Sequence, residues 1–297
     1  MKISISFPTI RKGWLENTFR ALGNQSLPHQ DWELVMIDDY GDRWEEVRNL
    51  AQEYEVNVKY MHSKPYYWKS NRQLGNARNT GFIHSDGELI VFLDDYSWVE
   101  PRWLEAHWRY YNTWGRAVIG KVQSVAFNSG KITSKEDLAL GEREDERWLS
   151  IRPRKTLAPC PPGWFWTFNA SAPLSKIILV NGYDEEFDCT GEDDVDLGLR
   201  LSKMGVSFIY TTNPEIVVYH MKHNGGLSRP SPFKPEECHR VTKDLYGTKY
   251  DGSWGLLERN SRRPPWRVNV KPSGEYYFHL AEARKERDKY PCKEWKI

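Results

Sequence analysis

The chain has 297 residues, with 42 Lys and Arg against 41 Asp and Glu and a formal net charge of +1. This balance does not indicate a polyanionic partner, and no apolar run approaches the roughly 20 residues of a membrane-spanning helix. The first residues lack the apolar core of a signal peptide, and the four cysteines have no C-x-x-C spacing. We therefore expect reduced thiols, no zinc site and a cytoplasmic location.

Strand-like and helix-like segments alternate with short links through residues 1–125. Alternation of this kind predicts an α/β fold with a mostly parallel, doubly wound sheet flanked by helices. The predicted strands cover residues 2–7, 32–37, 56–61, 89–93 and 117–122. The predicted helices cover residues 14–22, 44–54 and 75–81, with another beginning at Pro101.

The second half of the chain is less regular. Residues 126–160 are charged and poorly patterned, which predicts a mobile loop. A helix with apolar residues at Leu197, Leu201 and Met204 precedes two short strands at 206–210 and 216–219. The alternation stops near Gly225, so we divide the chain into a domain of residues 1–225 and an irregular extension of residues 226–297.

Two acidic pairs follow predicted strands of this sheet. Asp38-Asp39 comes after the second strand and Asp94-Asp95 after the fourth. Ligands of open α/β sheets bind outside the carboxyl ends of the strands. A turn could explain Asp38-Asp39 alone, but the repeated arrangement predicts a polar site for a ribose, a base edge or a divalent cation.

A third acidic stretch, residues 184–196, runs into the helix that contains Leu197. Negative charge is stabilised at a helix N-terminus, so a solvated helix cap is one interpretation. The alternative is a catalytic carboxylate that works with the strand-end pairs. In that case Asp184, Glu185 and Glu186 serve as loop and capping residues, and Asp196 lies on the solvated face of the helix.

Several of these segments, in this order, resemble a family 2 type glycosyltransferase with the Rossmann-like GT-A fold. The resemblance covers about residues 1–223 and includes the segment Ala77-Arg78-Asn79-Thr80-Gly81. The other matching segments are Pro8-Thr9 and residues 24–28, 35–39, 91–95, 180–187 and 191–194. On this interpretation residues 1–225 form the catalytic domain, and the extension either binds the acceptor or packs on that domain.

The resemblance implies a role for each matching position. The residues implied to bind the donor are Pro8, Thr9, Asp38, Asp39, Arg78, Asp94 and Asn169. Asp95 and His220 would hold a divalent metal, Mn²⁺ or Mg²⁺, although an ion pair for Arg78 and a satisfied strand-end His220 remain alternatives. Glu192 and Asp193 would face the acceptor, with Asp193 as the general base. One position departs from the pattern: the third residue of the family's D-x-D motif is Tyr96, a poor ligand for these metals.

The resemblance implies an inverting enzyme that moves a sugar from a nucleotide-sugar donor, predicted to be UDP-linked, to an acceptor hydroxyl. The acceptor stays open among a glycan, a glycolipid, a protein, a small molecule and a modified nucleic acid. A carbohydrate- or nucleic-acid-binding protein on a catalytically retired GT-A scaffold is the main alternative. A nucleotidyltransferase is disfavoured because a Gly-rich N-terminal phosphate loop is missing.

Overall fold

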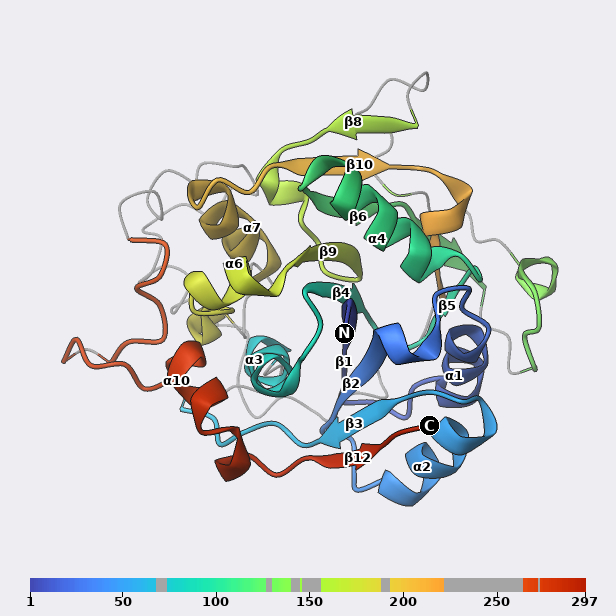
Figure 1. The fold of residues 1–297 in the computed structure, drawn as a ribbon, viewed down its shortest axis with the longest axis horizontal. Coiled ribbons are helices and arrows are strands. Elements are labelled where there is room, and N and C mark those ends of the chain that lie inside the picture. Colours follow the sequence, from blue (N-terminus) through green and yellow to red (C-terminus); the bar gives the residue numbers. More distant parts are fainter. Residues whose placement is uncertain are drawn as a thin grey trace.

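The protein was analysed as a computed structural model, which describes residues 1–67, 74–126, 130–139, 145, 156–187, 193–221, 264–271 and 273–297. Within these residues nine strands form the main sheet, in the order β12-β3-β2-β1-β4-β9-β6-β10-β8 (Figure 1). Their bounds, in that order, are Lys293–Trp295, Val58–Met61, Trp32–Asp38, Ile3–Thr9, Leu89–Leu93, Asn169–Pro173, Ala117–Gly120, Phe208–Thr211 and Leu157–Pro159.

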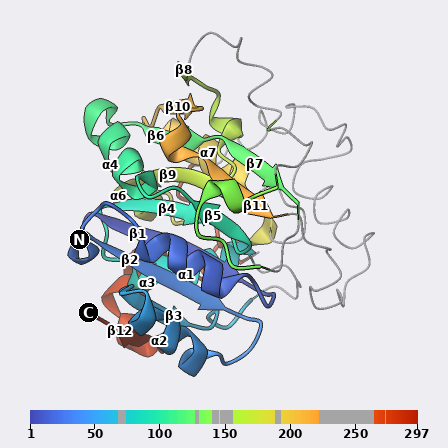
Figure 2. The same cartoon turned by 90° about the vertical axis from the view of Figure 1, so that its right-hand side faces the viewer.

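The pairs β1–β2, β1–β4, β2–β3 and β6–β10 are parallel, which confirms the predicted mostly parallel sheet. β9 is antiparallel to both β4 and β6, between which it lies. A second, three-stranded sheet contains β5 (Ser97–Val99), β11 (Val218–Met221) and β7 (Val122–Val125). Figure 2 shows this small sheet beside the carboxyl ends of β1 and β4.

Helices cover both faces of the main sheet (Figure 1). On one face α1 (Leu15–Gly23), α2 (Trp44–Glu53) and α4 (Trp103–Trp114) contribute residues such as Phe19 and Trp103 to a buried apolar cluster. On the other face a second cluster includes residues of α3 (Leu74–His84), α6 (Leu174–Leu179), α7 (Asp193–Lys203) and α10 (Leu280–Lys285). No helix in the described part of the chain has the length and apolar character to cross a bilayer.

α3 is buried around almost its whole circumference, which is unusual for a helix of a small domain. It packs on β1 and β2 on one side and is covered by α10 on the other. Gly81 allows the close approach to the sheet, because a Cβ there would lie 2.7 Å from Cδ1 of Ile37. The polar side chains of this helix therefore face protein rather than solvent.

The described part of the C-terminal extension packs on the preceding α/β domain. β12 pairs antiparallel with β3, and α10 contacts α3 and α6. Together with the residues after β3, this segment encloses a cavity of about 660 Å³ whose lining includes Lys64, Tyr67, Tyr277 and Tyr290.

Part of the segment between residues 126 and 160, which was predicted to be a mobile loop, packs against the core. Ile132 is fully buried and Leu138 nearly so, both in the cluster that contains α1. Asn17 of α1 also holds this segment, since its side chain accepts from Ile132 N at 2.8 Å and donates to Gly130 O at 3.1 Å. Residues 130–139 are thus a loop, as predicted apart from the short helical turn Lys135–Asp137, and this loop packs on the core.

Candidate active site

The strand-end acids come together because β1, β2 and β4 are parallel neighbours. Thr9, the last residue of β1, is in register with Asp38, the last residue of β2, and Pro8 with Ile37. Asp38 is fully buried, and Arg43 forms a two-pronged ion pair with it through Nε at 2.8 Å and Nη2 at 2.9 Å. Tyr60 also donates its hydroxyl to Asp38 at 3.1 Å.

Asp39 is half-buried beside this pair. Its backbone N–H donates to Thr9 O at 2.8 Å, and its carboxylate accepts from Ser63 N at 2.9 Å. In the first acidic pair, the carboxylate of Asp38 is thus engaged by Arg43, whereas Asp39 stays partly exposed at the strand ends.

The two acids of the second pair, Asp94 and Asp95, also differ in how far their side chains are exposed. Asp95 has a side chain only 1% exposed and accepts from Thr9 Oγ1 at 2.8 Å and from Arg11 Nε at 3.0 Å. Arg11 Nη2 donates to its other oxygen. Asp94 is one-quarter exposed and pairs with Arg78 Nη2 at 3.0 Å.

Arg78 is the central cation of the site. Its side chain is 1% exposed and lies among three carboxylates: Asp94, Asp194 at 2.9 Å and Asp193 at 3.8 Å. Burial raises the pKa of Asp94 to about 6, although the Arg78 charge acts in the opposite direction. The ion pair considered for Arg78 is therefore present, but its partners are acids of the site rather than a surface acid.

Two adjacent aspartates begin α7, and their environments differ. Asp194 accepts from Arg78, from the Tyr183 hydroxyl at 3.1 Å, and from both the backbone N–H (3.0 Å) and the hydroxyl of Thr167. Asp193 is 4% exposed, and its Oδ2 has no hydrogen-bond partner. Burial and then the Asp194 charge raise the pKa of Asp193 to about 7. Glu192, the other predicted acceptor-side acid, lies outside the described residues.

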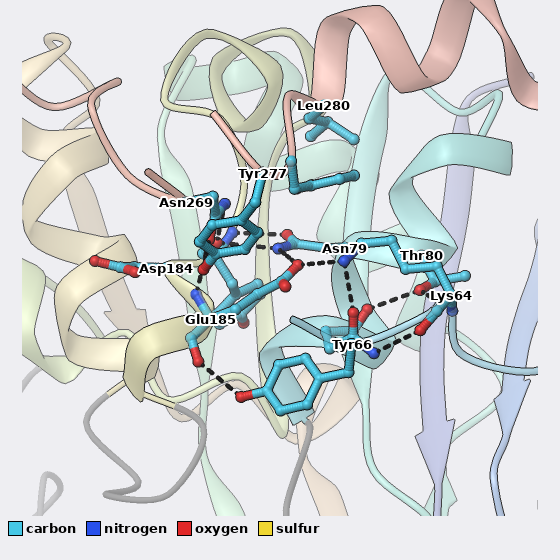
Figure 3. A network of polar contacts seen from close by, with 12 residues as sticks. Lys64, Tyr66, Asn79, Thr80, Asp184, Glu185, Asn269, Tyr277 and Leu280 are labelled. Carbon is cyan, nitrogen blue, oxygen red and sulfur yellow. Dashed lines mark hydrogen bonds and ion pairs between the residues drawn. The ribbon is translucent and has the colours of Figure 1, made fainter. Parts of the chain in front are cut away.

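The segment before α7 is held by the network in Figure 3. Glu185 is fully buried and accepts from Lys64 at 2.7 Å and from Asn79 of α3 at 2.9 Å. Asn269, in the C-terminal extension, accepts from Glu185 N at 2.9 Å and donates to Tyr183 O at 2.9 Å. Residues 183–185, at the start of the acidic stretch, are thus held by α3, by the residues after β3 and by the extension.

This arrangement predicts that Asn269→Ala destabilises the protein by about 1–3 kcal/mol, because it leaves the buried Glu185 N–H without a partner. Chemical denaturation measures the loss. The matched control in the same segment is Lys271→Ala, which removes a surface pair with Glu275 and should cost under about 1 kcal/mol. Equal effects of the two variants would contradict the structural role of Asn269.

Two further predicted positions, Asn169 and Asp196, differ from expectation, and His220 lies across from the residues that follow Asp95. Asn169 is fully buried in β9, where its amide donates to Lys121 O and Ile216 O, both at 2.8 Å, and accepts from Trp103. These contacts join strands and favour a structural role over the predicted contact with the donor sugar. His220 lies in β11 opposite Ser97. Asp196 is not on a solvated face as predicted: it is 4% exposed and pairs with Arg200 at 2.7 Å.

Several residues of the site were not predicted. Arg11, Arg43, Thr167 and Tyr183 each bind a carboxylate of the site, but only Tyr183 lies in one of the matching segments, and that segment does not indicate this contact. Two of these contacts, Arg11 with Asp95 and Thr167 with Asp194, join residues that are far apart in the sequence. A usable signal was charge balance, since a cluster of buried acids requires buried cations.

The divalent metal that the resemblance implies does not fit Asp95 as the structure places it. Both carboxylate oxygens accept from Thr9 or Arg11, and a guanidinium occupies the position that a second cation would need. Among the described residues, no three His, Cys, Asp or Glu side chains lie close enough together to hold a metal ion.

Comparisons with solved structures identify the fold. N-acetylgalactosaminyltransferase GalNAc-T7, solved with UDP, GalNAc and Mn²⁺, matches with a TM-score of 0.62 at 15% identity, covering 98% of this chain and 55% of that one. Staphylococcus aureus TarS, residues 1–349 with UDP, matches with a TM-score of 0.57 at 11% identity, covering 92% and 68%. The predicted GT-A fold is confirmed.

Sequence comparisons give the family. Validoxylamine A glucosyltransferase of Streptomyces hygroscopicus subsp. limoneus is 25% identical over 227 residues, covering 69% of this chain and 48% of the relative. The poly(ribitol-phosphate) β-N-acetylglucosaminyltransferase TarP of S. aureus is 31% identical over 110 residues, covering 37% and 32%. The chain thus spans about half or less of these curated relatives. The model of glycosyl transferase family 2 matches residues 5–170, more than half of the chain. The chain therefore belongs to glycosyl transferase family 2, as its ordered motifs predict.

Proposed function

We propose that this protein is an inverting glycosyltransferase that moves a sugar from a UDP-linked donor to an acceptor hydroxyl. The observation that carries the proposal is the buried Oδ2 of Asp193, which accepts no hydrogen bond and which Arg78 links to Asp94 at the end of β4. Relatives named above act as glycosyltransferases, and two similar structures were solved with UDP.

In the proposed reaction Asp193 removes the proton of the acceptor hydroxyl as its oxygen attacks the anomeric carbon. The bond from that carbon to the diphosphate oxygen breaks, and the diphosphate leaves with the bonding electrons. One displacement inverts the anomeric centre. A carboxylate whose pKa is raised to about 7 is a stronger base than an ordinary one and is still about half ionised at neutral pH.

On the donor side, Thr9 and the half-buried Asp39 lie at adjacent strand ends, where a nucleoside binds in sheets of this class. Asp94 lies next to them, oriented by Arg78. The Mn²⁺ or Mg²⁺ implied by the resemblance, and present in GalNAc-T7, has no place in this scheme because Asp95 does not fit it.

A donor screen tests the proposal. The purified chain is incubated with a panel of nucleotide sugars, in EDTA and in Mn²⁺, and released nucleotide is measured. We expect slow hydrolysis of one UDP-sugar, which Asp193→Asn suppresses. No hydrolysis of any donor, together with tight binding of an oligosaccharide or oligonucleotide, would instead establish a binding protein on a retired scaffold.

A further inference from the structure

We propose that Arg11 is the fixed cation of the donor site, which binds the diphosphate of the nucleotide in place of a divalent metal. This inference rests on the proposed function, because it assumes a nucleoside diphosphate ligand. It begins from the disagreement between Asp95 and the metal that the family resemblance implies.

Arg11 is joined to Asp95 by a fork of two hydrogen bonds, from Nε at 3.0 Å and from Nη2. Thr9 completes the set from the end of β1. Bidentate pairs between arginine and a carboxylate are among the strongest and most directional contacts in proteins. A hydrated Mg²⁺ or Mn²⁺ would have to displace this guanidinium before reaching a carboxylate that is 1% exposed.

The contact of Tyr96 with Arg11 favours the arginine over a metal as the cation at this position. The residue is 4% exposed and has a φ of 59°, a left-handed conformation that non-glycine residues rarely adopt. The Arg11 guanidinium carbon lies 5.6 Å from the centre of its ring, a cation–π distance. Burial and the Asp95 charge raise the pKa of the Tyr96 phenol, so the hydroxyl stays neutral at physiological pH.

The loop that carries Arg11 is fixed at its other end by a second arginine. Arg43, held by the buried Asp38, donates Nη2 to Arg11 O at 3.2 Å and Nη1 to Lys12 O. Gly13 then turns the chain with a φ of 70°, and a Cβ there would lie 3.6 Å from Asp95 Cβ. Arg11 is thus positioned from both sides before any ligand arrives.

The position and chemistry of Arg11 suit a diphosphate. Its side chain keeps 19% of its surface exposed, at the carboxyl ends of β1 and β4. A guanidinium is always protonated, and its planar donors match phosphate oxygens. The Asp95 and Tyr96 contacts hold this charge in place, so the negative charge that builds up on the leaving diphosphate meets a cation without recruiting an ion.

Titration calorimetry with UDP and uridine as the probes tests this inference. For the wild-type chain we expect the Kd of UDP to change by less than about threefold between EDTA and Mn²⁺. Arg11→Gln should weaken UDP binding at least tenfold in EDTA, about 1.4 kcal/mol, and leave uridine binding unchanged. The matched control is Lys12→Gln, an exposed neighbour in the same loop, which should bind both ligands like wild type.

Two results would overturn the inference. One is UDP binding to the wild-type chain that is tenfold or more tighter in Mn²⁺ than in EDTA. This measurement needs no variant, so it tests the inference even if Arg11→Gln fails to fold. The other is wild-type UDP affinity in a folded Arg11→Gln variant. Absence of UDP binding under every condition would instead remove the proposed function, so the two failures are distinguishable.

Discussion

Replacing Asp193 with asparagine is expected to reduce glycosyl transfer by about 10²–10⁴-fold, the usual contribution of a general base. The UDP affinity should remain, because the substitution is nearly isosteric and Asp193 lies on the acceptor side of the proposed site. The measurements are kcat/KM with the donor found in the screen and calorimetry with UDP.

The pH profile adds a second readout to this variant. Asp193 acts as a base in its ionised form, and burial raises its pKa to about 7. We therefore expect kcat/KM of the wild-type chain to fall about tenfold per pH unit below pH 7 and to level off above it. Asp193→Asn should lose this acidic limb.

Asp194→Asn is the matched control, since it changes the adjacent carboxylate. Arg78, Thr167 and Tyr183 engage the oxygens of Asp194, so this variant should lower stability more than Asp193→Asn does. If Asp194→Asn abolishes transfer in a folded protein while Asp193→Asn retains full activity, the base is Asp194 and our assignment is wrong.

Arg78→Met should be among the most destabilising single substitutions, at about 3–5 kcal/mol, because it leaves buried carboxylates without their cation. The loss should depend on pH. The pKa values of Asp94 and Asp193 are raised in the folded protein, to about 6 and 7, so both are largely protonated at pH 5 and ionised at pH 8. The deficit relative to wild type should therefore grow from pH 5 to pH 8.

Urea denaturation at the two pH values measures this effect. Arg78→Lys serves as the control, since it keeps the charge but cannot reach Asp94 and Asp194 with separate planar donors. Its loss should be smaller than that of Arg78→Met at pH 8. A deficit that is equal at both pH values would show that packing, and not charge, accounts for the role of Arg78.

Much of the parallel half of the sheet was predictable because its strands are short segments rich in apolar residues, and the acidic pairs mark the ends of two of them, β2 and β4. The predicted strand at residues 89–93 coincides with β4, and the parallel order brings Thr9, Asp38 and Asp94 together. β9 was missed because its sequence, NASAP, has no β-branched or aromatic residue. Its conformation depends on pairing with β4 and β6, which no local pattern reveals.

The site was predictable to the extent that it consists of acids in motifs. The resemblance implied that Arg78 binds the donor, but the sequence could not show that it is buried among Asp94, Asp193 and Asp194. The sequence also could not show that Arg11 pairs with the carboxylate of Asp95, since that contact depends on the conformation of the loop after β1. Partners that meet only in the folded chain set the charge state of each carboxylate.

β12 has a consequence for how the protein is made. This strand covers the free edge of β3, yet it comes from residues 293–295. On the ribosome the backbone groups along that side of β3 therefore stay unpaired until the end of the described chain has been synthesised. An unpaired strand edge can pair with other chains and seed aggregation. During biosynthesis this edge of the sheet therefore stays exposed until residues 293–295 have been made, and chaperone binding there would protect it until β12 pairs with β3.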